Sequence, residues 1–398
     1  MKTVSVLLLI SCAFSAVLGQ ENNVCPTFED YYTIKDNSHC WYDLTAEFTT
    51  PEIISRLGYP VLDDNVRNPK AKYHPVYLQH GLVATCANFV GLGKNSLAIV
   101  LADAGYDVWL GNYRGNQYSE EHVNLTVKDE AYWDHSLDEV ANLDIPAIFN
   151  TILSHSAPGS KIIFIGHSLG TSISLMYSAE YPEQSKHIMK MMVLLCPAYT
   201  LTNMISPFKT AAPSGSLILD TVRQLKLERM VSQAGELRRV VVPLCTESPP
   251  MMQLCMQMYN LFYGPNTDLG PESIPVYFNQ LPGGTSIKIL NHAADFVLGN
   301  FRRYNYGPLN YKYYGRPTPP VYDIKKIKVP VYLMFSAQDW ATPEADARNL
   351  WKHLSEEARY GIRKIDMDTF NHIDFVFGRH AREIVYDPLV EVLNKAIE

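Results

Sequence analysis

The stretch of residues 166–170, Gly-His-Ser-Leu-Gly, constrains this chain more than any other. It follows an apolar run at 161–165, typical of a buried strand, and precedes a helical pattern at 171–181 that ends at Pro182. Strand, G-x-S-x-G and helix in this order indicate a nucleophile elbow, whose glycines leave room for a sharp turn around a strained serine. The helix N-terminus also directs free N–H groups toward that serine. Ser168 is therefore the predicted nucleophile, and the alternative is a serine in an ordinary strand–helix turn.

Strand and helix patterns alternate on both sides of this motif. Strands are predicted at 75–79, 106–110, 161–165, 191–196, 329–336 and 363–367, and helices at 51–58, 95–104, 137–155, 171–181, 344–353 and 382–396. Repeated strand–helix units indicate an α/β fold with a mostly parallel sheet covered by helices on both faces. The alternation is interrupted at 197–320, where Pro, Tyr and Met are frequent. We predict a cap or lid there, inserted into a core formed by residues 20–196 and 321–398.

The first 19 residues are typical of a secretory signal peptide and are expected to lie outside the fold. Lys2 is followed by a mostly apolar run at 4–18, and small or apolar residues at 17–19 suit a cleavage site. The run is too short and too often broken by serine for a membrane anchor, and no later segment is apolar enough to cross a bilayer. The net charge of −7 argues against nucleic acid as a partner. We expect a protein that is secreted (extracellular) or lysosomal, with no transmembrane segment.

An oxidising compartment favours disulfides among the six cysteines that follow residue 19, although the sequence does not fix their pairing. The close pairs Cys25–Cys40 and Cys245–Cys255 are the first candidates. The other two cysteines flank predicted core strands and are equally consistent with buried free thiols; they are Cys86 and Cys196. Asn124 begins an Asn-Leu-Thr glycosylation sequon, which predicts an exposed loop.

A serine hydroxyl needs a base to remove its proton, and the base needs an anion to orient it. After a nucleophile elbow the expected chain order is serine, acid, histidine, each following a strand. Asp339 and His372 each come shortly after a predicted strand, in that order, and are the predicted acid and base. Asp339 could instead cap the next helix, with Asp346 or Asp374 as the acid. His372 could likewise be an ordinary loop histidine.

The segment His80-Gly81-Leu82 follows the strand at 75–79, where the second donor to an oxyanion is expected. The predicted donors are the backbone N–H groups of Leu82 and Leu169. Gly81 allows the backbone to approach the substrate, and we expect His80 to brace this loop through a hydrogen bond. The sequence has no CxxC, HExxH or glycine-rich phosphate loop, so it implies no metal and no organic cofactor.

Several segments together resemble the acid lipases (gastric, lysosomal and insect lipase-3-like enzymes) of the α/β-hydrolases. They are 77–82, 103–112, 114–116, 139–147, the elbow, 299–301, 304–307, 339–340 and 371–375, within a resemblance that spans about residues 51–390. The resemblance implies an α/β-hydrolase fold and hydrolysis of neutral-lipid esters, triacylglycerol or steryl ester, at an oil–water or membrane interface. It implies an acyl-enzyme mechanism with Ser168, Asp339 and His372 as the triad. It also implies a lid over an apolar acyl tunnel and a cap disulfide between Cys245 and Cys255.

Three features depart from the family pattern. Only residues 61–73 separate Gly58-Tyr59-Pro60 from the next strand, so one or two edge strands are missing and an exposed sheet edge is expected. Leu169 stands where the family often has Gln, which a backbone donor tolerates. The segment that contains Cys25 and Cys40 has no counterpart in the pattern.

Two questions stay open at this level. The Met-rich segment 251–262 fits either a helix packed on the core or a lid that lines an adaptable acyl site. The function also has two alternatives to a lipase: a non-catalytic lipid carrier on the same fold, and an esterase for short soluble esters.

Overall fold

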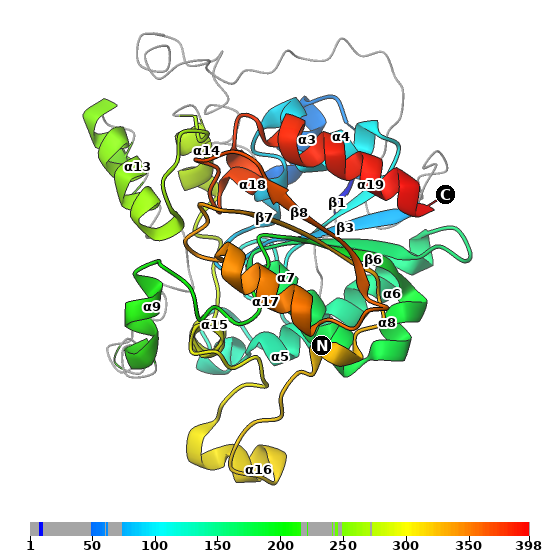
Figure 1. Ribbon diagram of the computed structural model, residues 1–398, viewed down its shortest axis with the longest axis vertical. Helices are drawn as coiled ribbons and strands as arrows, with labels where there is room; N and C mark the ends of the chain where they lie inside the picture. The colour runs from blue at the N-terminus through cyan, green and yellow to red at the C-terminus, as the bar shows by residue number, and fades with distance from the viewer. Residues whose placement is uncertain are drawn as a thin grey trace.

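The computed structural model describes residues 8–10, 49–59, 61–62, 74–215, 221, 241, 243–245, 249–270 and 273–397. Its centre is an eight-stranded sheet with the order β2-β1-β4-β3-β5-β6-β7-β8 (Figure 1). The strands are β1 (Leu8–Ile10), β2 (Val61–Leu62), β3 (Pro75–Gln79), β4 (Asp107–Gly111), β5 (Ile162–His167), β6 (Met189–Leu195), β7 (Val331–Ser336) and β8 (Arg359–Ile365). All pairs from β4 to β8 are parallel, while β1 is antiparallel to β2 and β4. The predicted α/β fold with a mostly parallel sheet is confirmed.

Helices cover both faces of the sheet, as Figure 1 shows. One face carries α3 (Thr50–Arg56), α4 (Leu97–Asp103), α18 (Asp374–Phe377) and α19 (Asp387–Ile397). The other face carries α5 (Leu137–Glu139), α6 (Ile145–His155), α7 (Leu169–Glu180), α8 (Pro182–Ile188) and α17 (Glu344–His353). Shorter 3-10 or π-helical turns are η2 (Cys86–Phe89), η3 (Gly93–Asn95), η4 (Glu130–Trp133), η5 (Val140–Asp144), η6 (Ala212–Ser214), η7 (Gly307–Leu309), η8 (Ile324–Lys326) and η9 (Arg382–Tyr386).

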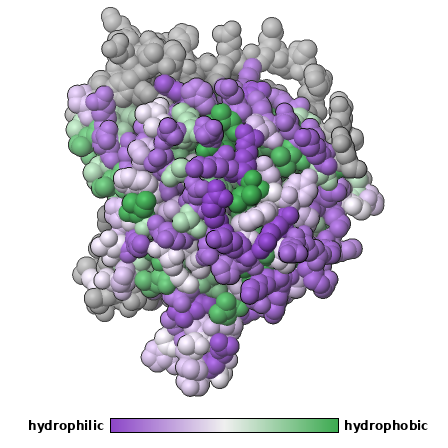
Figure 2. Space-filling view, viewed as in Figure 1, coloured by the Kyte–Doolittle hydropathy of each residue, from purple (hydrophilic) through white to green (hydrophobic). Residues whose placement is uncertain are grey.

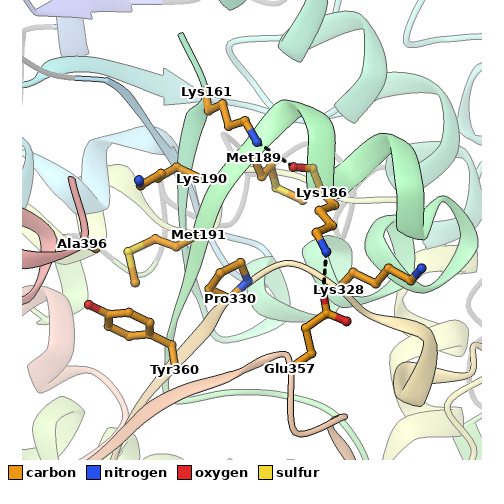
Figure 3. A pocket seen from close by; sticks show the side chains of 10 residues that line it. All are labelled: Lys161, Lys186, Met189, Lys190, Met191, Lys328, Pro330, Glu357, Tyr360 and Ala396. Carbon is orange, nitrogen blue, oxygen red and sulfur yellow. Dashed lines mark hydrogen bonds and ion pairs between the residues drawn. The ribbon is translucent and has the colours of Figure 1, made fainter. Parts of the chain in front are cut away.

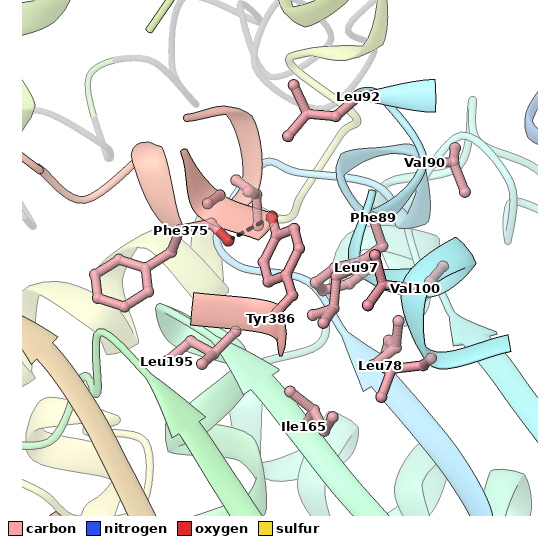
Figure 4. Packing of buried hydrophobic residues seen from close by; sticks show 14 of the residues in the cluster. Leu78, Phe89, Val90, Leu92, Leu97, Val100, Ile165, Leu195, Phe375 and Tyr386 are labelled. Atoms are coloured by element: carbon pink, nitrogen blue, oxygen red, sulfur yellow. Dashed lines mark hydrogen bonds between the residues drawn. The ribbon is translucent and has the colours of Figure 1, made fainter. Parts of the chain in front are cut away.

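The two faces have separate apolar cores because successive side chains of a strand point to opposite sides. In β3, Val76 and Leu78 pack on the α4 side, whereas Tyr77 packs on the α7 side. Figure 4 shows the first core, where strand residues meet helix and loop residues; those labelled include Leu78, Ile165, Leu195, Leu97, Val100 and Tyr386. In contrast, most of the outer face seen in Figure 2 is hydrophilic, with apolar side chains in small separate groups. The carboxyl ends of the parallel strands are thus held on a rigid double-sided core.

A long insertion between β6 and β7 carries α9 (Phe208–Ala211), α13 (Pro249–Tyr263), α14 (Ser273–Gln280), α15 (Ile287–Val297) and α16 (Asn310–Tyr314). Cys245 and Cys255 form a disulfide that links α13 to the chain before it. The insertion does not stand apart from the core as a whole, because Ile289 and Phe296 of α15 belong to the core on the α7 side. The cap boundaries at 197 and 320 therefore stay a prediction.

The edge of the sheet differs from the expectation. Residues 8–10, within the predicted signal peptide, pair with β4 as strand β1, and β2 pairs with β1 in turn. An edge strand leaves backbone N–H and C=O groups without partners, and this short apolar segment satisfies those of β4. The edge expected to be exposed is covered here by a segment expected to lie outside the fold. Cleavage after residue 19 stays a prediction, and it would remove β1.

Two further expectations concern the cysteines and a membrane-spanning segment. The Cys25–Cys40 pair lies outside the described residues, whereas Cys86 and Cys196 are buried free thiols. Within the described part of the chain, every helix is too short or too polar to cross a bilayer.

Candidate active site

Ser168 lies on a strained turn between β5 and α7. Its backbone angles are φ 55° and ψ −125°, in a region that non-glycine residues rarely adopt. The neighbouring glycines are required by close packing. A Cβ atom on Gly170 would lie 2.3 Å from the carbonyl oxygen of Gln79, and one on Gly166 would lie 2.8 Å from the backbone of α7. The elbow therefore rests directly on the carboxyl end of β3, and only glycine fits at both positions.

The predicted acid and base are in contact at the same edge of the sheet. His372 Nδ1 is 2.8 Å from Asp339 Oδ2, and both side chains are buried. The other carboxylate oxygen accepts hydrogen bonds from the backbone N–H groups of Ala341 (2.9 Å) and Thr342 (2.7 Å), and the Thr342 hydroxyl donates to Oδ2. Burial alone would raise the pKa of Asp339, but the neighbouring His372 and these hydrogen bonds hold that pKa below its usual value. Asp339 is thus a stable anion that fixes the imidazole orientation.

The alternative carboxylates have other partners. Asp346 accepts hydrogen bonds from Asn203, and Asp374 accepts them from the backbone of Asn371 (2.6 Å) and from Asn266 (2.6 Å). Burial also raises the pKa of Asp374 to about 8, which makes it a poor anion at neutral pH. Neither contacts the His372 ring, so among these three carboxylates the geometry favours Asp339.

The His372 ring is enclosed by groups that leave one nitrogen for the nucleophile. Its described hydrogen-bond contacts, with Asp339 and with Thr342 at 3.4 Å, are all at Nδ1. His167 donates from Nε2 to the His372 carbonyl oxygen (3.0 Å), and burial lowers the pKa of His167 to about 3, so this ring stays neutral. No direct bond between Ser168 Oγ and His372 is present among the described residues, a common state before substrate binds. Nε2 is available to take the Ser168 proton.

The predicted oxyanion donors lie on two loops that touch each other. A Cβ atom on Gly81 would lie 2.9 Å from Ser168 Cβ, so the loop after β3 runs against the nucleophile. The backbone N–H groups of Leu82 and Leu169 have no acceptor among the described residues. Val83, next along the loop, has a positive φ of 51°, which indicates a strained loop held by its surroundings. Two unoccupied N–H donors beside a serine can bind the oxyanion of a tetrahedral intermediate.

The loop after β4 braces this oxyanion loop. The His80 ring packs against Tyr113 with ring centroids 4.6 Å apart, and His80 Nδ1 is 2.9 Å from the carbonyl oxygen of Gly81. Asn116 Nδ2 donates to the carbonyl oxygen of Ala84 at 2.7 Å. Burial lowers the pKa of His80 to about 4, so it braces the loop as a neutral ring.

A buried ion pair fixes the bracing loop to the helices of the α7 face. Arg114 Nε lies 2.9 Å from Asp144 Oδ1, and Asp144 also accepts from the Arg114 backbone at 3.3 Å. Asp144 ends the π-helical turn η5, directly before Ile145, the first residue of α6. Removing one partner of a buried pair leaves the other charge uncompensated, so this contact holds the loop strongly in place.

A hollow lies at the opposite edge of the sheet. It has a volume of about 350 Å³ and is lined by lysines and apolar residues at the amino ends of β5, β6 and β7 (Figure 3). Lys161 donates to the carbonyl oxygen of Lys186 (3.0 Å), and Lys186 pairs with Glu357. Ligands of open α/β sheets bind at the carboxyl ends of the strands, where Ser168 and His372 lie. We therefore do not assign this hollow to the catalytic site.

Among the described residues, the possible metal ligands that lie close together overlap with the candidate active site. One cluster has suitably spaced donor atoms, within 4.8 Å of one another, and consists of His167, Cys196 and His372. It contains the proposed base, whose Nδ1 already bonds Asp339. Burial also raises the pKa of the Cys196 thiol well above its usual value, which opposes the thiolate that metals prefer. We assign no resident metal to it.

Some contributors to the site were not found from the sequence. His167 braces the His372 backbone, and Thr342 supports Asp339. Tyr263 of α13 stacks on the His372 ring. Only His167 had a visible signal, its place next to the nucleophile. Asn124 lies on an exposed loop, as its sequon requires, and its glycosylation stays a prediction.

Several known proteins are similar to this chain. Residues 74–378 match the family described as the alpha/beta hydrolase fold. Lipase member K of Mus musculus is 33% identical over 328 residues, 81% of this chain and 80% of that protein. The lysosomal acid lipase/cholesteryl ester hydrolase of Homo sapiens is 31% identical over 326 residues, 80% of this chain and 79% of that protein. A solved esterase from Exiguobacterium antarcticum has a TM-score of 0.49 and 15% identity, covering 81% of this chain and 92% of that one. The resemblance seen in the sequence is confirmed, and the chain belongs to the acid lipase family of the α/β-hydrolases.

Proposed function

We propose that this protein is a lipase that hydrolyses carboxylic esters of neutral lipids, triacylglycerol or steryl ester, through an acyl-enzyme. The observation that carries the proposal is the shared edge of the sheet: Ser168 on a strained elbow, beside a buried His372–Asp339 pair. The relatives named lipase and cholesteryl ester hydrolase support the substrate class. The name of the human relative also supports a lysosomal location, while secretion stays an expectation from the predicted signal peptide.

The chemistry follows from the position of each group. His372 removes the hydroxyl proton of Ser168, whose oxygen attacks the ester carbonyl, while Asp339 stabilises the imidazolium that forms. The backbone N–H groups of Leu82 and Leu169 hold the negative oxygen of the tetrahedral intermediate. His372 then gives its proton to the leaving alcohol, and an acyl group remains on Ser168. Water, activated by the same histidine, releases the fatty acid and restores the serine.

Helix α13 supports action at a lipid surface. Leu254, Met258 and Leu261 are each about half exposed, at 54%, 53% and 49%, and their spacing of four and three residues places them on one side of the helix. On the other side, Met252 is fully buried and Tyr259 packs against the core. The Met-rich segment is thus a helix with one side packed on the core and one apolar side open to solvent, and its role as a lid or acyl-pocket lining stays a prediction. We propose that the open side contacts the lipid phase.

The test is release of fatty acid from emulsified trioleoylglycerol and of nitrophenol from p-nitrophenyl butyrate, with Ser168→Ala as the matched variant. We expect the wild type to hydrolyse both substrates and Ser168→Ala to lose activity by several orders of magnitude. Hydrolysis of the soluble ester alone would instead support an esterase for short esters. A wild type as inactive as Ser168→Ala on every ester would support a lipid carrier and refute the lipase.

A further inference from the structure

The carboxyl end of cap helix α13 is bonded to both loops that carry the acid and the base. The Tyr263 carbonyl oxygen accepts from the backbone N–H of Trp340 (3.2 Å), the residue after Asp339. The Gly264 carbonyl oxygen accepts from Asn371 Nδ2 (2.8 Å), the residue before His372. The acid loop and the histidine loop are thus joined through two consecutive residues of the cap.

Gly264 shows how close this contact is. Its φ is +106°, and a Cβ atom there would lie 2.1 Å from the carbonyl oxygen of Gln338. Gln338 immediately precedes Asp339, so the cap backbone lies against the acid loop with no space for a side chain. The end of α13 therefore has one tightly defined position relative to the triad.

Tyr263 presents its aromatic face to the catalytic imidazole. The rings of Tyr263 and His372 are almost parallel, with an interplanar angle of 11° and centroids 5.5 Å apart, an offset-stacked arrangement. Three further aromatic rings lie behind Tyr263. The ring centroids are 4.7 Å apart for Tyr263 and Tyr259, 4.7 Å for Tyr259 and Tyr277, and 5.1 Å for Tyr277 and Phe377. Phe377 belongs to the core on the α4 side of the sheet. This aromatic row connects the core to the His372 ring and prevents Tyr263 from moving away from it.

We propose that Tyr263 is a positioning residue for the catalytic histidine, through which the placement of the cap controls the geometry of the triad. The proposal rests on the proposed function, because it concerns the same site. The Tyr263 ring limits rotation of the imidazole, so that Nδ1 stays on Asp339 and Nε2 stays available to Ser168. Its π-face also favours the positive charge that the imidazole acquires when it takes the serine proton. The ring of His167, whose centroid is 5.0 Å from that of His372, is neutral and does not oppose that charge.

The test compares Tyr263→Leu, which removes the ring, with Tyr263→Phe, which keeps it. The matched control is Phe262→Leu, the adjacent aromatic residue of α13, which contacts Phe208 at 5.0 Å instead of the histidine. Tyr263→Met is a second ring-free variant, and thermal unfolding establishes which variants are folded. Each is measured for kcat and KM on p-nitrophenyl butyrate, and for the NMR resonance of the His372 Nδ1 proton.

For both ring-free variants we expect kcat to fall about tenfold with little change in KM, because stacking and cation–π contacts have about that worth. Their Nδ1 proton resonance should shift or broaden. Tyr263→Phe and Phe262→Leu should keep the wild-type kcat and the wild-type resonance. The proposal is overturned if the ring-free variants match Phe262→Leu, or if Tyr263→Phe is as impaired as they are. The resonance needs no turnover, so it still decides the positioning role if the wild type hydrolyses no ester and the proposed function fails.

Discussion

Gly170→Ala tests whether the elbow and the oxyanion loop are packed as closely as the structure shows. An added Cβ would lie 2.3 Å from the carbonyl oxygen of Gln79 and 2.8 Å from that of His80. Both obstacles are backbone atoms at the end of β3, so the loops must separate by about 1 Å to restore an ordinary contact. A glycine-to-alanine change inside a helix normally stabilises by about 1 kcal/mol, whereas overpacking costs about 1–3 kcal/mol. We expect a net destabilisation of about 1 kcal/mol.

The effect on catalysis should be larger than the effect on stability. The separation would move the N–H group of Leu169 relative to that of Leu82, and a misplacement of about 1 Å typically costs about a hundredfold in rate. The assay is kcat on p-nitrophenyl butyrate together with the inhibition constant of an alkyl boronic acid, which binds Ser168 as a tetrahedral adduct. The value of kcat should fall and the inhibition constant should rise by similar factors, since both depend on the oxyanion donors.

Gly215→Ala is the control for this experiment. The nearest atom to its added Cβ is Ala294 Cβ at 3.5 Å, an ordinary contact, so stability and kcat should stay at wild-type values. The reasoning is refuted if Gly170→Ala keeps kcat within about threefold of the wild type and unfolds at the same or a higher temperature. In that case the elbow and the oxyanion loop would not be in contact.

Three other predictions concern the acid, the pH dependence of stability and the lipid surface. Asp339→Asn should lower kcat on the soluble ester by about four orders of magnitude, because the imidazole loses its anion and its tautomer; a loss below tenfold would assign the acid to another carboxylate. His135 is buried away from the triad, and burial, with a smaller contribution from Arg114, lowers its pKa from 6.5 to about 4. Between pH 6.5 and about 4 the unfolded chain binds a proton at His135 that the folded chain does not, so the free energy of unfolding falls as the pH falls through this range. His135→Gln should therefore reduce the pH slope of the unfolding free energy by about 1.4 kcal/mol per pH unit between about pH 6 and 4.5; denaturant unfolding at several pH values measures this slope, and an unchanged slope would contradict the assignment. Leu254→Ser combined with Met258→Ser should slow hydrolysis of emulsified trioleoylglycerol severalfold and leave p-nitrophenyl butyrate unaffected, and an equal loss on both substrates would mean that these residues serve the fold.

The regular elements could be predicted wherever burial gives a clear pattern. The helix predicted at 344–353 is α17 (Glu344–His353), and the strand predicted at 75–79 is β3, whose five residues are all buried. The last strand was placed at 363–367 but runs over Arg359–Ile365. It is an edge strand with only its final residue buried, and its charged residues Arg359, Arg363 and Lys364 leave only a weak apolar signal. Pro182 was taken as the end of a helix, but it also begins α8, because proline suits the first position of a helix.

The positions of the candidate catalytic residues could be predicted better than the contacts that support them. Ser168, Asp339 and His372 follow strands of a parallel sheet, whose carboxyl ends lie at one edge, so chain order was enough to bring them together. The bond from His167 to the His372 carbonyl joins residues 205 apart in sequence. The contact of Tyr263 with His372 depends on how the cap folds back. No local pattern encodes either contact.

The cap contacts the oxyanion loop as well as the histidine. The backbone N–H of Gly283 donates to the carbonyl oxygen of Val83 (2.6 Å), and the Gly283 carbonyl oxygen accepts from the backbone N–H of Gln117 (2.8 Å). A Cβ on Gly283 would lie 2.7 Å from the carbonyl oxygen of Ala84, so this contact too is made through bare backbone. The histidine loop has a further support from the core on the α4 side, because the Tyr386 hydroxyl donates to the carbonyl oxygen of Phe375 at 2.9 Å (Figure 4).

These supports divide the site into a fixed part and a part that depends on the cap. The elbow rests on β3 and β6, since the Ser168 N–H also donates to the Leu195 carbonyl oxygen (3.1 Å), and these contacts do not involve the insertion. The strained oxyanion loop and the orientation of His372 instead rely partly on Gly283 and Tyr263 of the insertion. A movement of the cap that opens the site to a lipid would therefore weaken the oxyanion donors and the base together. From the proposed function we therefore expect efficient turnover to require the cap in the position seen here, so that catalysis favours substrates that hold the cap in place.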